Sequence, residues 1–246
     1  MALATGFLKE MHGVLGDCAI MHRGNKVFVK SRPGKSKKPP TELALAKKAS
    51  FGLAGKIAGN ISSIEEIKHF WKGNPEKNQT GYNRMFQANH CQFNLEDFSG
   101  KVVLSDGYGL EVVNPSIEIE EAGLLINCDS FESVDVKKRE AAKYVRAAGI
   151  IILKSPTVTG CAEYELMQFQ TKDCRIEKGE KFSAEVKYLG GDGVKFQTFA
   201  IKKAFAVLIS VDSEMNLTDI SKTIESEVVL ENIPAEIEND IAMVGE

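Results

Sequence analysis

The stretch HRGNKVFVKSRPGKSKKPPTELALAKKAS, from His22 to Ser50, marks a change of local structure near the start of the chain. It holds seven Lys or Arg residues between Arg23 and Lys38 and no acidic residue in that interval. Its first part alternates as a β-strand does, and its middle is rich in proline and lysine. We therefore expect a strand, an exposed loop and then a helix.

Residues 13–31 are predicted to form a β-hairpin. Residues 18–21 give a short apolar strand, and residues 26–30 give the returning strand. Residues 23–25, Arg-Gly-Asn, supply the turn because Gly and Asn tolerate positive φ. Alternation along the returning strand places its two valines on one side and its two lysines on the other.

The cations of this stretch are the candidate residues for contact with an assembly partner or an anion. They are Arg23, Lys26, Lys30, Arg32, Lys35, Lys37 and Lys38. One interpretation is a solvated basic face or assembly contact, since lysine at a strand edge guards against unwanted pairing. The alternative is nucleic-acid binding, in which these cations neutralise phosphates and Phe28 stacks on a base.

Three helices are predicted after the loop. Thr41 caps the first, which runs to about Ala58 and ends at Gly59-Asn60. Its residues Ala46, Ala49, Leu53 and Ile57 fall on one face at helical spacing. Ser63 and Glu66 form a capping box for the second, whose apolar stripe includes Trp71 as a core residue. The third is expected from Tyr82 to His90.

From about Cys91 the pattern changes to short strands separated by turns. Seven or eight strands at this spacing predict an immunoglobulin-like or fibronectin-III-like β-sandwich, and a small barrel would show much the same pattern. Gly190-Gly191-Asp192-Gly193 is interpreted as a hairpin turn. The expected fold class is therefore α+β. Its domains are a basic hairpin-and-helices module (1–92), a β-sandwich (93–212) and an acidic C-terminal segment or tail (213–246).

Charge divides along the chain. Residues 1–90 hold 15 Lys or Arg against 6 acids, whereas residues 91–246 hold 16 against 28. Opposite potentials attract, so this split permits head-to-tail contact between copies. The sequence has no run of 18 apolar residues, so we expect no membrane-spanning helix. Its first residues match a secretory signal poorly, so we expect none. We expect a location in the cytoplasm or within an assembled particle.

The sequence contains no recognisable catalytic motif. It has no Walker loop, no dinucleotide fingerprint and no G-x-S-x-G elbow. The five cysteines form no C-x-x-C pair, and His90-Cys91 is the nearest approach to a ligand pair. We therefore predict no metal site, no cofactor and no enzymatic activity.

The segments VKSRPGKSKKPPT (29–41), KKASFGLAGKI (47–57) and IEEIKHFWKG (64–73) carry a resemblance. The chain resembles an uncharacterised family of short bacterial proteins, a domain of unknown function, with a Gly-rich N-terminus, an Arg-Ser-x-Pro-type segment and a sandwich-like C-terminal half. Lys30-Ser31-Arg32-Pro33 matches that segment, Thr41 the helix start and Ser50-Phe51 the helix centre. Met21 and Val27 replace aromatic residues of the family's hairpin. The resemblance implies no catalytic residues.

Together these observations predict a non-enzymatic structural protein that assembles with itself through the basic arm and strand edges. Virion-like, tail-like or filamentous assemblies use such arms and sandwiches. This comparison is an analogy between folds. The first alternative is a nucleic-acid-binding accessory protein that uses residues 23–38. The second is a ligand-binding sandwich, for example for carbohydrate, which exposed aromatic residues would indicate.

Overall fold

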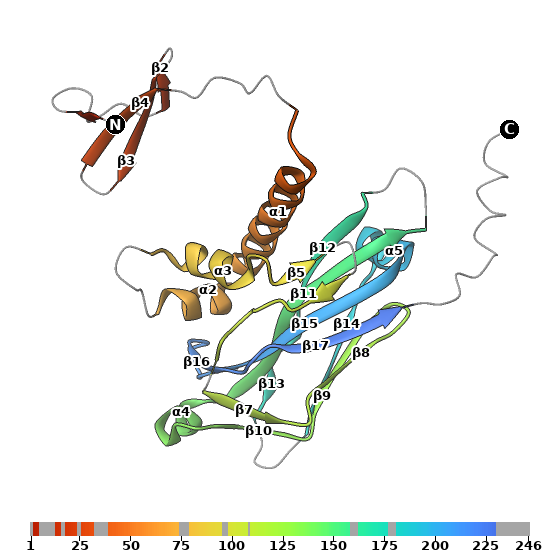
Figure 1. Cartoon of the computed structure of the whole chain (residues 1–246). Helices are drawn as coiled ribbons and strands as arrows, with labels where there is room; N and C mark the ends of the chain where they lie inside the picture. The colour runs from red at the N-terminus through yellow and green to blue at the C-terminus, as the bar shows by residue number, and fades with distance from the viewer. Residues whose placement is uncertain are drawn as a thin grey trace, which may run out of the picture. The chain divides into compact units, whose positions relative to one another are not determined.

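The structure is a computed structural model of the chain. It describes residues 2–4, 13–15, 18–23, 26–31, 39–73, 79–94, 98–107, 109–157, 162–176 and 181–229. The chain forms two compact units, Met1–Leu45 and Ala46–Glu246 (Figure 1). The boundary predicted at residue 92 thus falls inside the second unit.

The first unit contains a four-stranded antiparallel sheet in the order β1-β4-β3-β2. Its strands are β1 (Ala2–Ala4), β2 (Gly13–Leu15), β3 (Cys18–Arg23) and β4 (Lys26–Ser31). The predicted hairpin is confirmed, because β3 pairs with β4 and Ile20 lies opposite Val29. Val27 is buried and Lys26 and Lys30 are exposed, as strand alternation predicts.

Three of the described helices form one layer of the second unit, and the other two lie elsewhere in it. The helices are α1 (Glu42–Ser62), α2 (Glu65–Lys72), α3 (Gly81–Asn89), α4 (Val136–Ala141) and α5 (Gly190–Thr198). The hydroxyl of Thr41 accepts a hydrogen bond from the Ala44 amide at 3.3 Å, which confirms the predicted cap of α1. None of the described helices is both long and apolar enough to cross a membrane.

Two details of the helix prediction are wrong. Gly59-Asn60 does not end α1, which continues to Ser62. The capping box of α2 is absent: the Ser63 hydroxyl donates to the Asn60 carbonyl at 2.6 Å, and no side chain caps α2. Glu66 instead forms an ion pair with a distant strand, and this tertiary contact outweighs the local signal.

A long antiparallel sheet forms the centre of the second unit. Its two main strands, β11 (Tyr144–Pro156) and β15 (Phe199–Val211), pair along nearly their whole length. The other strands are β12 (Tyr164–Gln170), β13 (Cys174–Arg175), β16 (Leu217–Ile220) and β17 (Ile224–Val229). The predicted buried strand at 147–153 is confirmed as part of β11.

The remaining strands form smaller sheets around this centre. One has the order β14-β9-β8, and two are pairs, β10-β7 and β5-β6. Their bounds are β5 (Phe93–Asn94), β6 (Ser99–Gly100), β7 (Leu110–Val113), β8 (Ser116–Ile119), β9 (Gly123–Cys128), β10 (Ser130–Ser133) and β14 (Phe182–Lys187).

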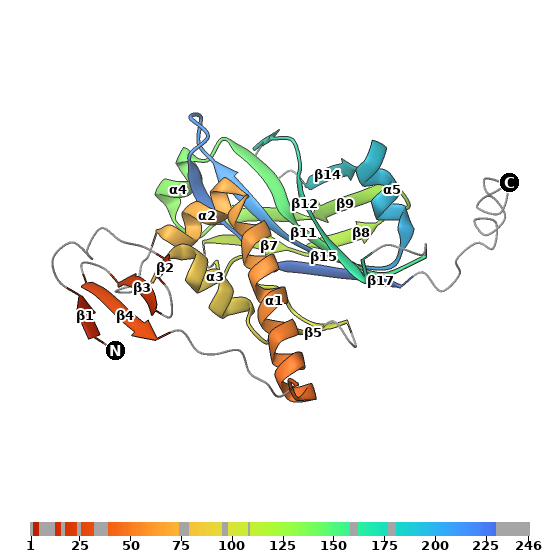
Figure 2. The same ribbon diagram turned by 90° about the horizontal axis from the view of Figure 1, so that it is seen from above.

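Both faces of the central sheet are buried. On one face, Ile150 and Phe205 pack in a core with Ile57 of α1 and Trp71 of α2. On the other, a core that includes Ile151 joins the sheet to β9, β14 and α5. The second unit is thus layered as helices, central sheet and smaller sheets (Figures 1 and 2).

The coarse prediction of helices combined with antiparallel sheets is confirmed. The immunoglobulin-like or fibronectin-III-like sandwich is not, because α1–α3 share one core with the central sheet. The predicted turn at Gly190 is wrong: these glycines begin α5, which Phe196 anchors in the second core. Residues 217–220 and 224–229 of the acidic segment are strands of the central sheet, and residues 230–246 lie outside the described part.

Candidate assembly surfaces

Some of the predicted basic residues meet on one hairpin. Lys26 and Lys30 are exposed on β4, and their spacing of four places them on the same face. Arg23 lies opposite Lys26 in the register, next to the turn. Arg32, Lys35, Lys37 and Lys38 lie outside the described residues.

Few of the described side chains in the sheet of the first unit are buried. Among its described side chains, Ile20 and Val27 are buried and Val29 packs against them. Burying one such side chain contributes roughly 1.5–3 kcal/mol, whereas ordering the backbone costs about 1–2 kcal/mol per residue. Val14 and Met21 on the same sheet are 59% and 48% exposed. We expect this sheet to gain stability when another surface covers it.

The N-terminal half of α1 is exposed. Every residue from 42 to 49 is exposed, and the buried residues of the helix start at Leu53. Ala46 and Ala49 share the helical face of Leu53 in the sequence pattern but are exposed. Leu43 and Phe51 are 66% and 60% exposed, which leaves apolar surface uncovered on this half of the helix.

An aromatic cluster joins this part of α1 to α3. The ring of Phe51 lies 4.6 Å from that of Phe86, and the Phe86 ring stacks on His90 at 5.6 Å. The Tyr82 hydroxyl donates to the Gly55 carbonyl at 3.2 Å and ties the two helices together. The signal in the sequence is the four-residue spacing of Phe86 and His90, which places both rings on one face of α3.

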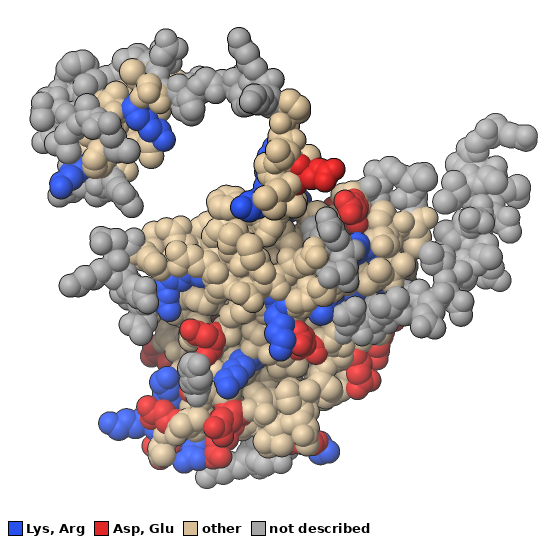
Figure 3. Space-filling model, viewed as in Figure 1, with Lys and Arg blue, Asp and Glu red and all other residues tan. Residues whose placement is uncertain are grey.

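The surface over α1 and α3 is mainly uncharged apart from exposed lysines of α1. In Figure 3 the face over α3 and the adjoining part of α1 is mainly uncharged, whereas acidic and basic side chains alternate lower on the second unit. Lys47 and Lys48 of α1 are exposed, and they lie four and three residues before Phe51. We call Lys47, Lys48, Phe51, Tyr82, Phe86 and His90 the α1–α3 surface.

Cys91 and His90 form the strongest nucleophile candidate. Cys91 is exposed, and its Sγ lies 3.6 Å from both ring nitrogens of His90 and accepts from the Ser50 hydroxyl at 3.7 Å. Because the two nitrogens are equidistant, neither is directed at the sulfur as a general base would be. No group of three metal-ligating side chains occurs within the described ranges. Cys161 lies outside them.

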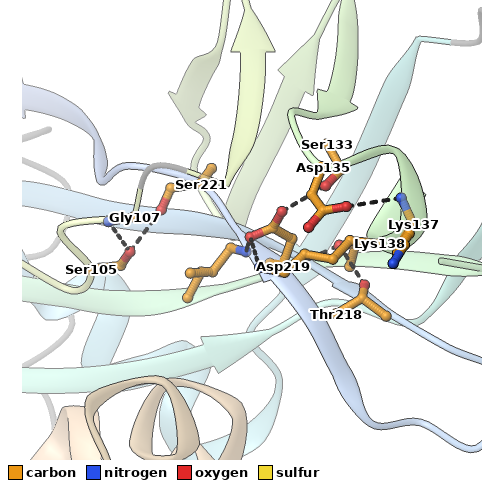
Figure 4. A network of polar contacts seen from close by, with 11 residues as sticks. Ser105, Gly107, Ser133, Asp135, Lys137, Lys138, Thr218, Asp219 and Ser221 are labelled. Atoms are coloured by element: carbon orange, nitrogen blue, oxygen red, sulfur yellow. Dashed lines mark hydrogen bonds and ion pairs between the residues drawn. The ribbon is translucent and has the colours of Figure 1, made fainter. Parts of the chain in front are cut away.

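A buried carboxylate organises a polar network around the strand β16 (Figure 4). Asp219 of β16 is 6% exposed, and its Oδ2 accepts from the Ser133 hydroxyl at 2.6 Å. Lys138 of α4 places its Nζ 3.7 Å from Oδ1. A Cβ atom on Gly109 would lie 1.6 Å from that Oδ1 atom, so the backbone reaches the carboxylate only without a side chain. The network joins β10, α4 and β16, so we assign Asp219 a structural role.

Ser105 and Ser221 extend the network toward β17. The Ser105 hydroxyl donates to the Ser221 carbonyl at 2.9 Å and accepts from the Gly107 amide at 2.7 Å. The Ser221 hydroxyl accepts from the Leu208 amide at 2.8 Å. These bonds hold residues 105–107 against the start of β17.

A groove of about 480 Å³ lies beside the hydrogen bonds between Ser105 and Ser221. Its walls are β7 on one side and residues 221–224 on the other. Within the described part, β7 pairs with β10 along one edge and meets the opposite wall only through an isolated bridge between Leu110 and Ser221. The free edge of β7 is thus an accessible site for a further strand.

Lys202 and Tyr188 are buried around Phe196 of α5. Lys202 of β15 is 3% exposed, and its Nζ lies 5.0 Å from the Phe196 ring centroid. Burial lowers the pKa of Lys202. The Tyr188 ring stacks on Phe196 at 4.9 Å, its hydroxyl has no hydrogen-bond partner among the described residues, and burial raises the pKa of Tyr188. Nothing in the local sequence signalled either residue.

The chain matches no protein-family model and no curated protein. The resemblance to the uncharacterised bacterial family therefore stays a prediction.

Proposed function

We propose that this protein is a non-enzymatic structural protein that assembles with itself through its N-terminal basic arm and through free strand edges. The observation that carries the proposal is that few of the described side chains in the first unit are buried. Among the described side chains it buries only Ile20 and Val27, yet its strands hold a regular four-stranded register. A sheet of this size is stabilised when it docks on a further surface.

A second copy supplies such a surface. The free edge of β7 beside the 480 Å³ groove accepts an added strand, and the exposed half of α1 offers apolar area. The charge difference between residues 1–90 and 91–246 favours contact between unlike parts of two copies. Such a head-to-tail contact produces rings or filaments, as in virion-like or tail-like assemblies.

Sedimentation velocity of the full chain at low and high salt tests the proposal. We expect particles larger than one chain at micromolar concentration in low salt, with partial dissociation as salt screens the charged contacts. Met21→Asp places a charge on the exposed part of the sheet and should weaken assembly. Val194→Asp, at a similarly exposed position on α5, is the matched control. A strict monomer at both salt concentrations contradicts the proposal.

A nucleic-acid-binding accessory protein is the second candidate function. Lys26, Phe28 and Lys30 lie on one face of β4, where two exposed cations flank an aromatic ring. Filter binding of single-stranded DNA or RNA at several salt concentrations tests it. We expect a steep dependence on salt that flattens when Lys26, Lys30, Lys35, Lys37 and Lys38 are changed to Gln. Failure to bind in low salt eliminates this function.

A further inference from the structure

The last part of the sequence has a pattern that complements the α1–α3 surface. Within residues 230–246, the apolar residues Leu230, Ile233, Ile237, Ile241 and Val244 are spaced by three or four. This spacing is typical of one face of a helix. The same residues 230–246 include five acids and no Lys or Arg. Pro234 is tolerated if the helix begins near Ile233, and Ile237, Ile241 and Val244 then form its apolar face.

The α1–α3 surface has the opposite character. Phe51 is 60% exposed and Tyr82 is 43% exposed, so apolar side chains lie open to solvent between α1 and α3. Lys47 and Lys48 lie one helical turn before Phe51, which places both cations beside the aromatic cluster. An amphipathic acidic helix fits such a surface because its apolar stripe covers the rings while its carboxylates meet the lysines.

We propose that residues 230–246 of one copy dock as a short amphipathic helix on the α1–α3 surface of a second copy. The inference rests on the proposed self-assembly and names the contact that drives it. A helix this short is marginal in water by itself and gains its stability from the surface on which it docks. In the proposed contact the apolar stripe that includes Ile237 and Ile241 faces the rings of Phe51 and Phe86, and the carboxylates of the segment face the two lysines.

The contact identifies the partner as a second copy of this chain. Each copy carries one acidic apolar segment and one basic aromatic surface, so each copy both donates and accepts. The two contacting surfaces differ, which makes the interface heterologous and the assembly a ring or an open filament.

Charge reversal on each side of the contact tests the proposal in the full chain. One variant combines Lys47→Glu with Lys48→Glu, and the other combines Glu236→Lys with Asp240→Lys. By sedimentation velocity at low salt, we expect each variant alone to associate at least about tenfold more weakly, because like charges then face each other. An equimolar mixture of the two variants should restore association, since each variant then meets a partner of opposite charge.

Two controls define what each result means. Lys137→Glu with Lys195→Glu reverses two exposed lysines on α4 and α5 and should leave association unchanged. A chain that carries all four substitutions at the contact should associate like the unaltered chain, which also shows that the substitutions permit folding.

Each unfavourable result has a distinct meaning. If the unaltered chain assembles but the two paired variants assemble equally well, the docking contact is wrong and the proposed self-assembly stands. If the four-substitution chain recovers but the mixture does not, the segment docks within its own chain, and the contact between copies is refuted. If the unaltered chain is monomeric throughout, the proposed function fails as well.

Discussion

Glu66 of α2 forms an ion pair with Arg146 of β11 and so connects the helical layer to the central sheet. The two side chains are 16% and 11% exposed, and the Arg146 guanidinium also lies 3.1 Å from Asp173. The Arg146 Nε atom has no hydrogen-bond partner among the described residues. Removing Glu66 would leave the buried guanidinium with Asp173, which is 33% exposed, as its remaining charged partner.

Glu66→Ala should therefore lower the free energy of unfolding by about 1–3 kcal/mol, because Arg146 loses its more buried partner and keeps Asp173. Urea denaturation followed by circular dichroism measures the change. Glu65→Ala, one residue earlier, removes a carboxylate that pairs with Lys68 in solvent and should have no measurable effect. Equal effects of the two substitutions would show that the connection to Arg146 adds nothing.

Gly109→Ala should destabilise the second unit by about 1–3 kcal/mol because its Cβ would overlap the buried Asp219 carboxylate. Asp219 cannot move away freely, since it holds hydrogen bonds to Ser133 and to the Ile220 amide. Gly52→Ala is the matched control: it lies in α1 with no atom within 4 Å of the added Cβ. That control should gain up to about 1 kcal/mol in helix propensity. Destabilisation by both substitutions to the same degree would refute the steric explanation.

Lys202→Met should stabilise the protein at neutral pH by about 1 kcal/mol because it removes a charge that burial disfavours. Burial lowers the pKa of Lys202 below 10.5 in the folded state. Between the folded and unfolded pKa values the unfolded chain binds more protons, so the free energy of unfolding of the unaltered protein rises with pH in that window. The advantage of the variant should consequently shrink as the pH approaches 10.5.

Urea denaturation of both proteins from neutral pH to about pH 10 measures this dependence. Lys195→Met, on the exposed face of α5, is the control and should show no such trend. A stability difference between Lys202→Met and the unaltered protein that is constant over the whole range would contradict a buried, titrating lysine.

Tyr188→Phe should raise the free energy of unfolding by about 1 kcal/mol, because the buried hydroxyl has no hydrogen-bond partner among the described residues. The stacked ring on Phe196 is retained in this variant. Thermal unfolding by calorimetry gives the comparison, with Tyr82→Phe as control because its hydroxyl does bond to Gly55. A lower melting temperature for Tyr188→Phe would show that its hydroxyl has a partner.

Elements with a clear local period were predictable from the sequence. The alternation of Lys26, Val27 and Phe28 predicted a strand with one buried side, and the structure confirms that burial. Trp71 was predicted as a core residue, and it is 3% exposed with its indole donating to the Leu104 carbonyl at 2.8 Å. Such signals succeed because residues within one or two turns decide them.

The candidate surfaces were less predictable. The basic residues were found from composition, but the aromatic cluster of Phe51, Phe86 and His90 joins two helices that are separate in sequence. Ala46 and Ala49 have the helical spacing of buried residues and are nevertheless exposed, because α1 extends beyond its packed half. Periodicity shows which face of a helix is apolar and does not show how much of that face is covered.

The sequence by itself determined the hairpin of the first unit, the three helices that follow it and the buried strand within β11. Only the tertiary structure decided that β11 pairs with β15 in a sheet covered on both faces, and that Glu66 binds Arg146 instead of capping its helix. The physical reason is distance along the chain. Hydrogen bonds and side-chain spacing within a few residues are local properties, whereas burial and charge pairing depend on segments that meet only after folding.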